Sequence, residues 1–348
     1  MTAETFRLTL RRPDDWHLHL RDGAMLERVA PATARQFARA IVMPNLSPPV
    51  TTPDAAKAYR ERIMAALPDG SDFQPLMTAY LTDETHPAQI AAGHADGTWV
   101  AAKLYPAGAT TNSAHGVTDI ANIRPVLAEM EKIGMVLCVH GEVTDKAVDV
   151  FDREAVFIEK VLIPTLADFP GLKVVFEHIT TKDGVDFVMA AGPNVAATVT
   201  PQHLMLNRNA LFEGGLRPHA YCLPVVKREE HRLAVRAAAT SGSPKFFLGT
   251  DSAPHPLAGK VSSCGCAGIY NAPYALEAYA SVFEQEGVLD RLEGFASEYG
   301  PAFYDLPLNA GTVTLERAPV TVEESIGEGA DALTPFLAGE TLGWRFVD

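Results

Sequence analysis

The sequence contains few cysteines and no long apolar run. Four cysteines in 348 residues do not make the framework of a disulfide-stabilised protein. The one close pair, Cys264 and Cys266, is spaced too tightly for an easy disulfide or zinc motif. No stretch approaches the ~18 consecutive apolar residues of a membrane-spanning helix, and the N-terminal residues lack the apolar core of a signal peptide. We therefore expect a cytoplasmic protein with buried or reduced thiols.

Basic side chains are also scarce relative to acidic ones. The chain has 29 Lys and Arg against 43 Asp and Glu, which gives a net charge of −14. Nucleic acids and anionic membranes require clustered Lys and Arg, so this balance disfavours both as partners. The net negative charge is still compatible with a small anionic substrate, because a nearby arginine or metal ion outweighs the electrostatic field of distant acidic residues. A hydrophobic share of 47% predicts an ordinary globular protein with an ample core.

Internal repeats, low-complexity tracts and long linkers are absent, which favours one domain over residues 1–348. What recurs is a short apolar, β-branched run followed by a helical pattern, as is typical of parallel strands covered by helices. No Gly-x-Gly-x-x-Gly turn follows the first strand, so a dinucleotide-binding doubly wound sheet loses its main support. We predict an α/β fold, a (β/α)8 TIM barrel. The expected strands are 16–20, 40–43, 74–80, 99–104, 135–140, 173–178, 195–200 and 245–249.

Helical patterns fill the intervals between these strands. We place the barrel at about residues 10–255 and a C-terminal extension, packed on the barrel, at about 256–348. The extension contains one clear helix over 273–285 and a Pro/Gly/Glu-rich tail from residue 307, which we expect to lie over the barrel. The expected barrel helices are 23–39, 53–67, 87–94, 119–132, 152–169, 182–191 and 229–240.

Two histidines in the first strand give the first indication of a metal site. Side chains alternate faces along a strand, so His17 and His19 should share one face, and Trp16, Leu18 and Leu20 the other. Imidazoles about 6–7 Å apart along a strand can reach a single metal ion. Arg21 has the same parity and lies one step further, where a fixed cation can hold an anionic group of a substrate. Taken alone, His-x-His is also compatible with a half-buried edge strand carrying two solvated histidines.

Polar side chains also follow five other predicted strands at their C-terminal ends. In (β/α)8 barrels the active site forms at that face from residues of several strands. Singly, each residue has an ordinary explanation, such as a hydrogen-bonded core histidine, a surface lysine or a helix cap. Their joint occurrence at one end of one barrel predicts a metal-dependent active site. These residues are Asn45, Lys103, His140, His178 and Asp251.

The segments around these residues resemble the metal-dependent amidohydrolase superfamily. Its binuclear members use His-x-His, a carboxylated lysine, two further histidines and an aspartate. Within the superfamily, the chain is most similar to the short bacterial type of the dihydroorotase family, with no departure at a position the family uses for metal or substrate. The matching segments cover nearly the whole chain and are 15–23, 43–46, 103–106, 109–113, 140–142, 176–181, 249–255 and 264–268.

The resemblance implies a site with two Zn²⁺ ions per subunit. His17, His19 and Asp251 would hold one ion, and His140 and His178 the other. Lys103, as N6-carboxylysine, and a hydroxide would bridge the two ions, with the hydroxide as nucleophile and Asp251 as general base and acid. The residues implied for substrate binding are Arg21, Asn45 and His255 at a carboxylate, His140, the backbone near Leu223 and Ala267, and Thr110 and Thr111 on a closing loop.

Physical chemistry accounts for these residue types. Two zinc ions about 3.5–4 Å apart need a bridging anion, and an unmodified lysine ammonium cannot be a ligand. Carboxylation turns Lys103 from a cation into an anion with two oxygens. Together with Asp251 and hydroxide, it reduces the charge of the two ions to a level that is tolerable in a dry pocket.

The implied function is the reversible interconversion of N-carbamoyl-L-aspartate and L-dihydroorotate, a step of de novo pyrimidine biosynthesis, by a homodimer acting on small molecules. Two alternatives stay open. A dihydropyrimidinase or hydantoinase shares the metal set, but in that family a β-sandwich segment precedes His-x-His, and only sixteen residues precede His17 here. Arg21 and Asn45 also favour a substrate with a carboxylate. A catalytically silent scaffold barrel usually loses metal ligands, whereas all six are present.

Overall fold

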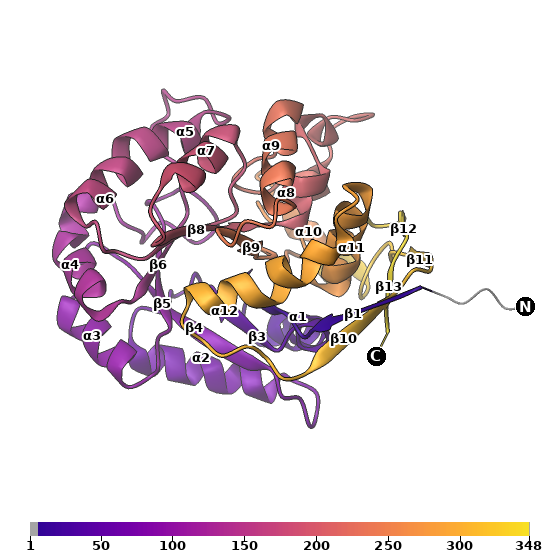
Figure 1. Ribbon diagram of the computed structural model, residues 1–348, viewed down its shortest axis with the longest axis horizontal. Helices are drawn as coiled ribbons and strands as arrows, with labels where there is room; N and C mark the ends of the chain where they lie inside the picture. Colours follow the sequence, from indigo (N-terminus) through magenta and orange to yellow (C-terminus); the bar gives the residue numbers. More distant parts are fainter. Residues whose placement is uncertain (1–5, 348) are drawn as a thin grey trace, which may run out of the picture.

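The computed structural model describes residues 6–347. Eight parallel strands form one sheet in which each strand lies next to its neighbours in sequence (Figure 1). Helices surround this sheet, so the predicted (β/α)8 barrel is confirmed. The strands are β2 (Asp14–Leu18), β3 (Arg39–Val42), β4 (Gln74–Tyr80), β5 (Ala101–Leu104), β6 (Val136–Val139), β7 (Val174–Phe176), β8 (Val195–Val199) and β9 (Phe246–Leu248).

The barrel closes between β9 and β2 through the residues that follow β9. The Asp251 backbone N–H donates to the carbonyl of His17 at 2.8 Å, and His19 N–H donates to the carbonyl of Ser252 at 3.0 Å. The buried Asp15 carboxylate accepts hydrogen bonds from the Thr250 backbone N–H at 2.8 Å and from the Thr250 hydroxyl at 2.5 Å. Burial raises the pKa of Asp15 to about 7. Closure of the barrel therefore places His17 and Asp251 side by side.

The helices begin and end close to the predicted positions. Thr52 caps the helix α2 (Pro53–Ala65) by accepting a hydrogen bond from Ala55 N–H at 3.2 Å, and Pro53 occupies its first turn. Among residues 6–347, no helix is long and apolar enough to cross a membrane. The helices of the barrel are α1 (Gly23–Gln36), α2 (Pro53–Ala65), α3 (Pro87–Ala95), α4 (Arg124–Ile133), α5 (Arg153–Phe157), α6 (Ile163–Asp168), α7 (Lys182–Ala190), α8 (Pro201–Met205) and α9 (Glu229–Ala239).

Alternate residues along the strands form two apolar layers. One layer lies between the sheet and the helices, and the other fills the inside of the barrel. The prediction that the Trp16 side chain shares one strand face with Leu18 and Leu20 is wrong. Its ring lies in the inner layer, stacked on Tyr304 at a centroid distance of 4.4 Å, whereas Leu18 and Leu20 belong to the outer layer. The reason is a shift in the register of β2 and β3 between Asp15 and Leu18, which breaks the strict alternation.

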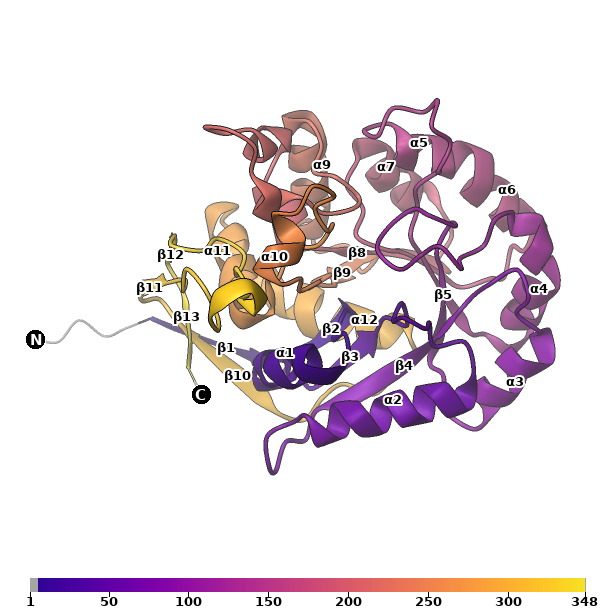
Figure 2. The same ribbon diagram turned by 180° about the vertical axis from the view of Figure 1, so that it is seen from behind.

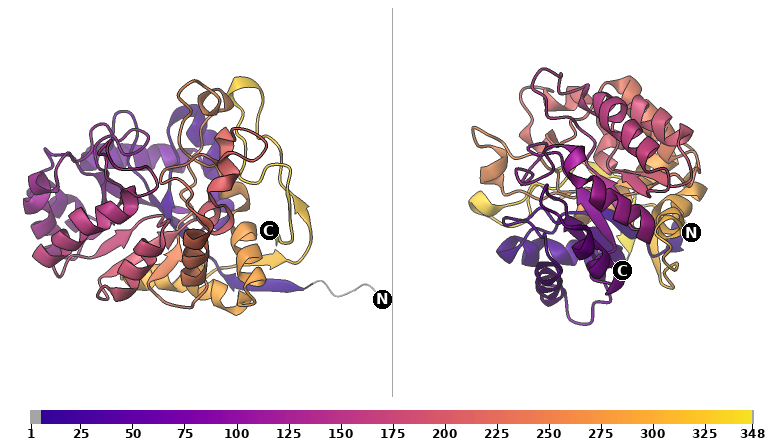
Figure 3. Two further views of the ribbon diagram at one scale, coloured as in Figure 1. Left: turned by 90° about the horizontal axis from the view of Figure 1, so that it is seen from above. Right: turned by 90° about the vertical axis from the view of Figure 1, so that its left-hand side faces the viewer.

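The two ends of the chain meet outside the barrel. Strand β1 (Arg7–Arg11) pairs antiparallel with β10 (Thr312–Glu316), which pairs with β13 (Arg345–Val347). Figures 2 and 3 show the segments of this sheet, from the indigo start and the yellow end of the described chain, at one side of the molecule. The predicted helix 273–285 is found as α11 (Ala275–Gln285), preceded by α10 (Leu257–Lys260) and followed by α12 (Tyr299–Phe303). The short strands β11 (Val320–Thr321) and β12 (Thr341–Leu342) pair with each other in the tail.

Candidate metal and substrate site

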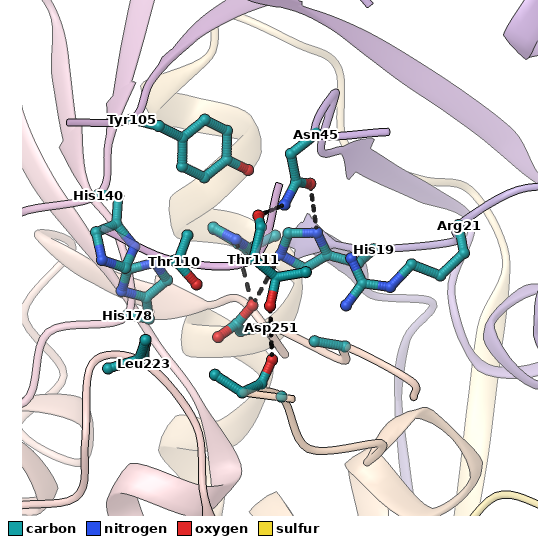
Figure 4. Close-up of a pocket in the computed structure, with 14 residues that line it drawn as sticks. His19, Arg21, Asn45, Tyr105, Thr110, Thr111, His140, His178, Leu223 and Asp251 are labelled. Carbon is teal, nitrogen blue, oxygen red and sulfur yellow. Dashed lines mark hydrogen bonds and ion pairs between the residues drawn. The ribbon is translucent and has the colours of Figure 1, made fainter. Parts of the chain in front are cut away.

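A pocket lies among the loops that follow the strands, at the face where the sequence predicts the active site (Figure 4). Every residue predicted for metal or substrate lines it, except Lys103 and His255, whose positions are described below. Tyr105, Ala253 and Gly268 line it as well and were not predicted. The full lining is His17, His19, Arg21, Asn45, Tyr105, Thr110, Thr111, His140, His178, Leu223, Asp251, Ala253, Ala267 and Gly268.

Three of the predicted metal ligands form a tight buried group. The possible ligand atoms of His17, His19 and Asp251 all lie within 4.8 Å of one another. Asp251 Oδ1 is 3.1 Å from His19 Nε2 and 3.4 Å from His17 Nε2. Burial raises the pKa of Asp251, but the hydrogen bond from His19 and the positive potential of His17, His19 and Lys103 outweigh it and hold that pKa at about 2. The carboxylate is therefore ionised and available as a ligand.

The Nδ1 atoms of His17 and His19 face hydrogen-bond acceptors. His17 Nδ1 lies 2.8 Å from Glu177 Oε2, which also accepts the Thr198 hydroxyl at 2.5 Å. His19 Nδ1 lies 2.8 Å from Asn45 Oδ1. With a metal ion bound, a proton on each Nδ1 would leave both Nε2 lone pairs free as ligands, in place of the hydrogen bond from His19 to Asp251. Glu177 was missed by the sequence prediction, although it immediately precedes a predicted ligand in a matching segment.

The remaining histidines adjoin this group. The ring of His178 lies 4.9 Å from the ring of His17 and 4.9 Å from that of His140, measured between centroids. His140 Nε2 is 2.9 Å from Glu142 Oε2. Burial lowers the pKa of His178 well below its usual value, so its ring is neutral. His178 Nδ1 is buried and has no hydrogen-bond partner among residues 6–347, which leaves a lone pair or N–H unsatisfied inside the protein.

Lys103 extends from β5 beneath the pocket. Its side chain is fully buried, and its Nζ has no hydrogen-bond partner in the described chain. Nζ lies 5.0 Å from the centre of the Tyr105 ring, and burial lowers the lysine pKa. A buried amine without partners is costly unless something completes its environment. With the unpartnered His178 nitrogen and a donor set of imidazoles and a carboxylate, it fits a zinc site with a modified lysine.

Arg21 reaches the opposite side of the pocket. Strand β2 ends at Leu18, and Arg21 has a φ of 58°, so strand parity does not extend to this residue as the prediction assumed. The Tyr59 hydroxyl donates to the Arg21 carbonyl at 2.6 Å and holds the backbone there. The guanidinium donates from Nε to the Pro254 carbonyl at 3.1 Å, and Nη2 is 3.0 Å from His255 Nε2. His255 thus stands behind Arg21.

Left-handed backbone occurs at three of these residues. Arg21, His178 and Asp251 have φ values of 58°, 40° and 45°. Residues other than glycine adopt this region at a cost of order 1–3 kcal/mol, and such strain concentrates at functional sites. In this protein the left-handed backbone changes the direction of each of these side chains shortly after a strand ends. The folded barrel must therefore supply the energy that holds these groups in place.

The loop with Thr110 and Thr111 crosses the mouth of the pocket. The Thr111 hydroxyl donates to the Ala267 carbonyl at 3.2 Å, and Asn45 Nδ2 donates to the Thr111 carbonyl at 2.9 Å. Asn112 Nδ2 returns a hydrogen bond to the Asn45 carbonyl at 3.0 Å. Asn45, which was predicted to bind a substrate carboxylate, thus uses its side chain for His19 and this loop.

Comparison with known proteins identifies the family of the chain. The family model described as the amidohydrolase family matches residues 15–319, so the chain belongs to this family. A dihydroorotase of Sphingopyxis alaskensis is 68% identical over 343 residues, which are 99% of this chain and 100% of that one. Within the amidohydrolases, the chain belongs to the dihydroorotases.

Solved structures support the same placement. The dihydroorotase of Campylobacter jejuni is 36% identical, with a TM-score of 0.90 over 99% of both chains. The dihydroorotase of Saccharomyces cerevisiae, in complex with 5-fluoroorotic acid, is 33% identical, with a TM-score of 0.90 over 98% of both chains. An L-hydantoinase (dihydropyrimidinase) of Arthrobacter aurescens is 18% identical, with a TM-score of 0.81 over 98% of this chain and 83% of that one. The last likeness concerns the fold alone.

Proposed function

We propose that the chain catalyses the reversible ring closure of N-carbamoyl-L-aspartate to L-dihydroorotate in pyrimidine biosynthesis. The observation that carries this proposal is the buried group of His17, His19 and Asp251 facing Arg21 across one pocket, in a chain 68% identical to a dihydroorotase over its length. A metal-binding group beside a guanidinium suits a substrate that has both an amide to be cleaved and a free carboxylate.

The second part of the proposal concerns the metal centre. His17, His19 and Asp251 would hold one zinc ion, His140 and His178 a second, and Lys103 would bridge them after carboxylation of Nζ. When bound, the two ions supply a water of lowered pKa and polarise the amide carbonyl. The unpartnered Lys103 Nζ and His178 Nδ1 support this assignment, because the ions and the carboxylate group would complete both environments.

Asp251 is the proposed proton carrier. Its Oδ1 faces the two histidines, which leaves Oδ2 as the oxygen that can exchange a proton with reacting groups. In the hydrolytic direction, Oδ2 would take a proton from the attacking water and deliver it to the leaving amide nitrogen. In the direction of ring closure, the same oxygen would take the proton from that nitrogen.

Arg21 and His255 are the proposed partners of the substrate carboxylate. His255 Nε2 faces both Arg21 Nη2 at 3.0 Å and the Ala267 carbonyl at 2.9 Å. Arginine can only donate and a carbonyl can only accept, so this one nitrogen satisfies one of them at a time. A bound carboxylate would resolve the conflict by accepting from both Arg21 and His255 Nε2–H, while the Ala267 carbonyl keeps its hydrogen bond from the Thr111 hydroxyl. The backbone groups of Leu223 and Ala267 would then form hydrogen bonds with the substrate ring.

Replacing Arg21 by methionine is expected to weaken substrate binding. Loss of one partner of a buried charge pair costs about 2–5 kcal/mol, which corresponds to a rise in KM of roughly 30-fold or more. Steady-state kinetics with L-dihydroorotate measure the change. Arg62→Met is the matched control, because Arg62 pairs with the neighbouring Asp22 at the surface and its loss should leave KM unchanged. Equal KM and kcat in Arg21→Met and the native enzyme would refute the assignment.

An assay on one sample tests the proposed function as a whole. We expect faster turnover of L-dihydroorotate than of dihydrouracil, with about two zinc ions per chain by elemental analysis. Faster turnover of dihydrouracil would identify a dihydropyrimidinase. Absence of bound metal together with absence of dihydroorotase activity would favour a silent scaffold.

We also propose that the enzyme is a cytoplasmic homodimer. This part rests on the resemblance to the short bacterial dihydroorotases. Analytical ultracentrifugation of the purified chain tests the dimer.

A further inference from the structure

Lys260, the last residue of α10, lies behind the pocket wall and takes no part in the proposed reaction. Only 4% of its surface is exposed. Its Nζ donates to the carbonyls of Tyr221 at 2.9 Å, Cys266 at 2.9 Å and Gly268 at 2.7 Å. An ammonium group has three N–H donors, so these carbonyls use all of them. Burial lowers the pKa of Lys260 to about 8, which still leaves the amine protonated at neutral pH.

The three carbonyls belong to two separate segments that both reach the pocket. Tyr221 lies two residues before Leu223, and Cys266 and Gly268 flank Ala267 on either side. Leu223 and Ala267 both line the pocket. The segments also touch directly, since Gly268 N–H donates to the Tyr221 carbonyl at 3.0 Å. Lys260 therefore sits at the junction of the two backbone stretches that are proposed to read the substrate ring.

Close packing fixes the second segment against its surroundings. Gly268 has a φ of 151°, and a Cβ there would lie 2.5 Å from the Ala253 carbonyl oxygen. A Cβ on Gly265 would lie 2.9 Å from the Lys260 carbonyl oxygen. On the pocket side, the Ala267 carbonyl faces His255 Nε2 and the Thr111 hydroxyl. Lys260 contacts the residues on both sides of Ala267 from the side away from the pocket. Together with the contacts above, it fixes the position of Ala267.

We propose that Lys260 is a positioning residue for the substrate ring: its ammonium ties segments 221–223 and 266–268 together and thereby sets the separation of Leu223 and Ala267. This inference rests on the proposed function, in which these two residues contact the ring. Lys260 touches neither the metal ligands nor the reacting groups named above, so its loss acts on substrate binding and not on the chemical step.

The test compares buried Lys260 with half-buried Lys245, which makes the same kind of contact. Lys260→Met removes all three donors and keeps an unbranched side chain that is one atom shorter. Lys245→Met is the matched control, because Lys245 Nζ also donates to three carbonyls, those of Ala191, Gly192 and Val195, at the start of β8 and far from the pocket. KM and kcat for L-dihydroorotate, the Kd of 5-fluoroorotic acid and the melting temperature are measured for both variants and for the native chain.

We expect Lys260→Met to raise KM and the Kd of 5-fluoroorotic acid roughly tenfold to hundredfold, with little change in kcat. Lys245→Met should lower only the melting temperature. If Lys260→Met does not fold, Lys260→Gln, which keeps one amide donor group, should show the same KM effect more weakly. Unchanged KM and Kd in a folded Lys260 variant of an active enzyme would overturn the positioning role, whereas an inactive native chain would overturn the proposed function itself.

Discussion

Lys103→Ala is expected to abolish turnover of L-dihydroorotate while leaving the fold intact. The lysine is fully buried, its Nζ has no hydrogen-bond partner within residues 6–347, and burial lowers its pKa. The lowered pKa increases the fraction of neutral amine, the form that reacts with CO₂, and the resulting anion would bridge the two metal ions. Because such ligands act as a unit, the loss in kcat/KM should be on the order of 10³-fold or more. The variant should remain folded by circular dichroism, with a lower melting temperature, because a buried side chain and a proposed metal ligand are lost.

The measurement combines kinetics, metal content and a signature of the modification. Native enzyme supplied with isotope-labelled bicarbonate should show a carbamate carbon by NMR, and Lys103→Ala should not. Lys173→Ala is the control, since Lys173 donates to the Phe303 carbonyl at 3.1 Å at the opposite end of the barrel and lies outside the pocket. Substantial turnover by Lys103→Ala without an added short carboxylic acid would contradict the bridging role.

The barrel and most of the pocket could be predicted from sequence for one physical reason. In a parallel barrel, residues that follow different strands converge at one face, so a list of strand ends is also a list of neighbours. Strand β4 was predicted with the bounds that the structure has, and β9 within one residue of each bound. His140, far from His17 in sequence, was thereby placed in the same pocket as His17.

Other features depend on contacts that no local pattern encodes. The register shift in β2 turns Trp16 into the barrel, and alternation alone could not predict it. Strand β1 pairs with β10 some three hundred residues away, so no pattern in the neighbouring residues predicts this pairing. Lys260 looks like a surface lysine in the sequence, because its three partners are backbone carbonyls of distant segments.

Glu177 is an intermediate case. It precedes His178 in a segment used for the prediction, but as a buried carboxylate that holds the Nδ1 of His17 it could not be distinguished from an ordinary strand residue. Its position depends on the inward face of β7 and on the hydroxyl of Thr198 from β8. The sequence thus indicates the residues directed at the proposed ions better than the residues that orient them, because orientation is set by three-dimensional packing.

Asp251→Asn is expected to reduce kcat by about 10²–10⁴-fold, the usual contribution of a positioned general acid and base. The substitution keeps the shape of the side chain and an oxygen that can face His17 and His19, but an amide cannot shuttle the proton between water and the leaving nitrogen. The backbone contacts that close the barrel, from Asp251 N–H to the His17 carbonyl and from His19 N–H to the Ser252 carbonyl, do not involve the side chain. The melting temperature should therefore stay near that of the native enzyme.

Metal content separates the two roles assigned to this carboxylate. If Asp251→Asn retains its zinc and loses kcat with KM little changed, the proton-transfer role accounts for the loss. If the zinc is lost as well, the side chain acts first as a ligand, and kinetics must be repeated at saturating zinc to expose the proton-transfer role. Activity close to that of the native enzyme at full zinc occupancy would mean that another group carries the proton. In that case Asp251, with its pKa of about 2, would serve only to bind the metal.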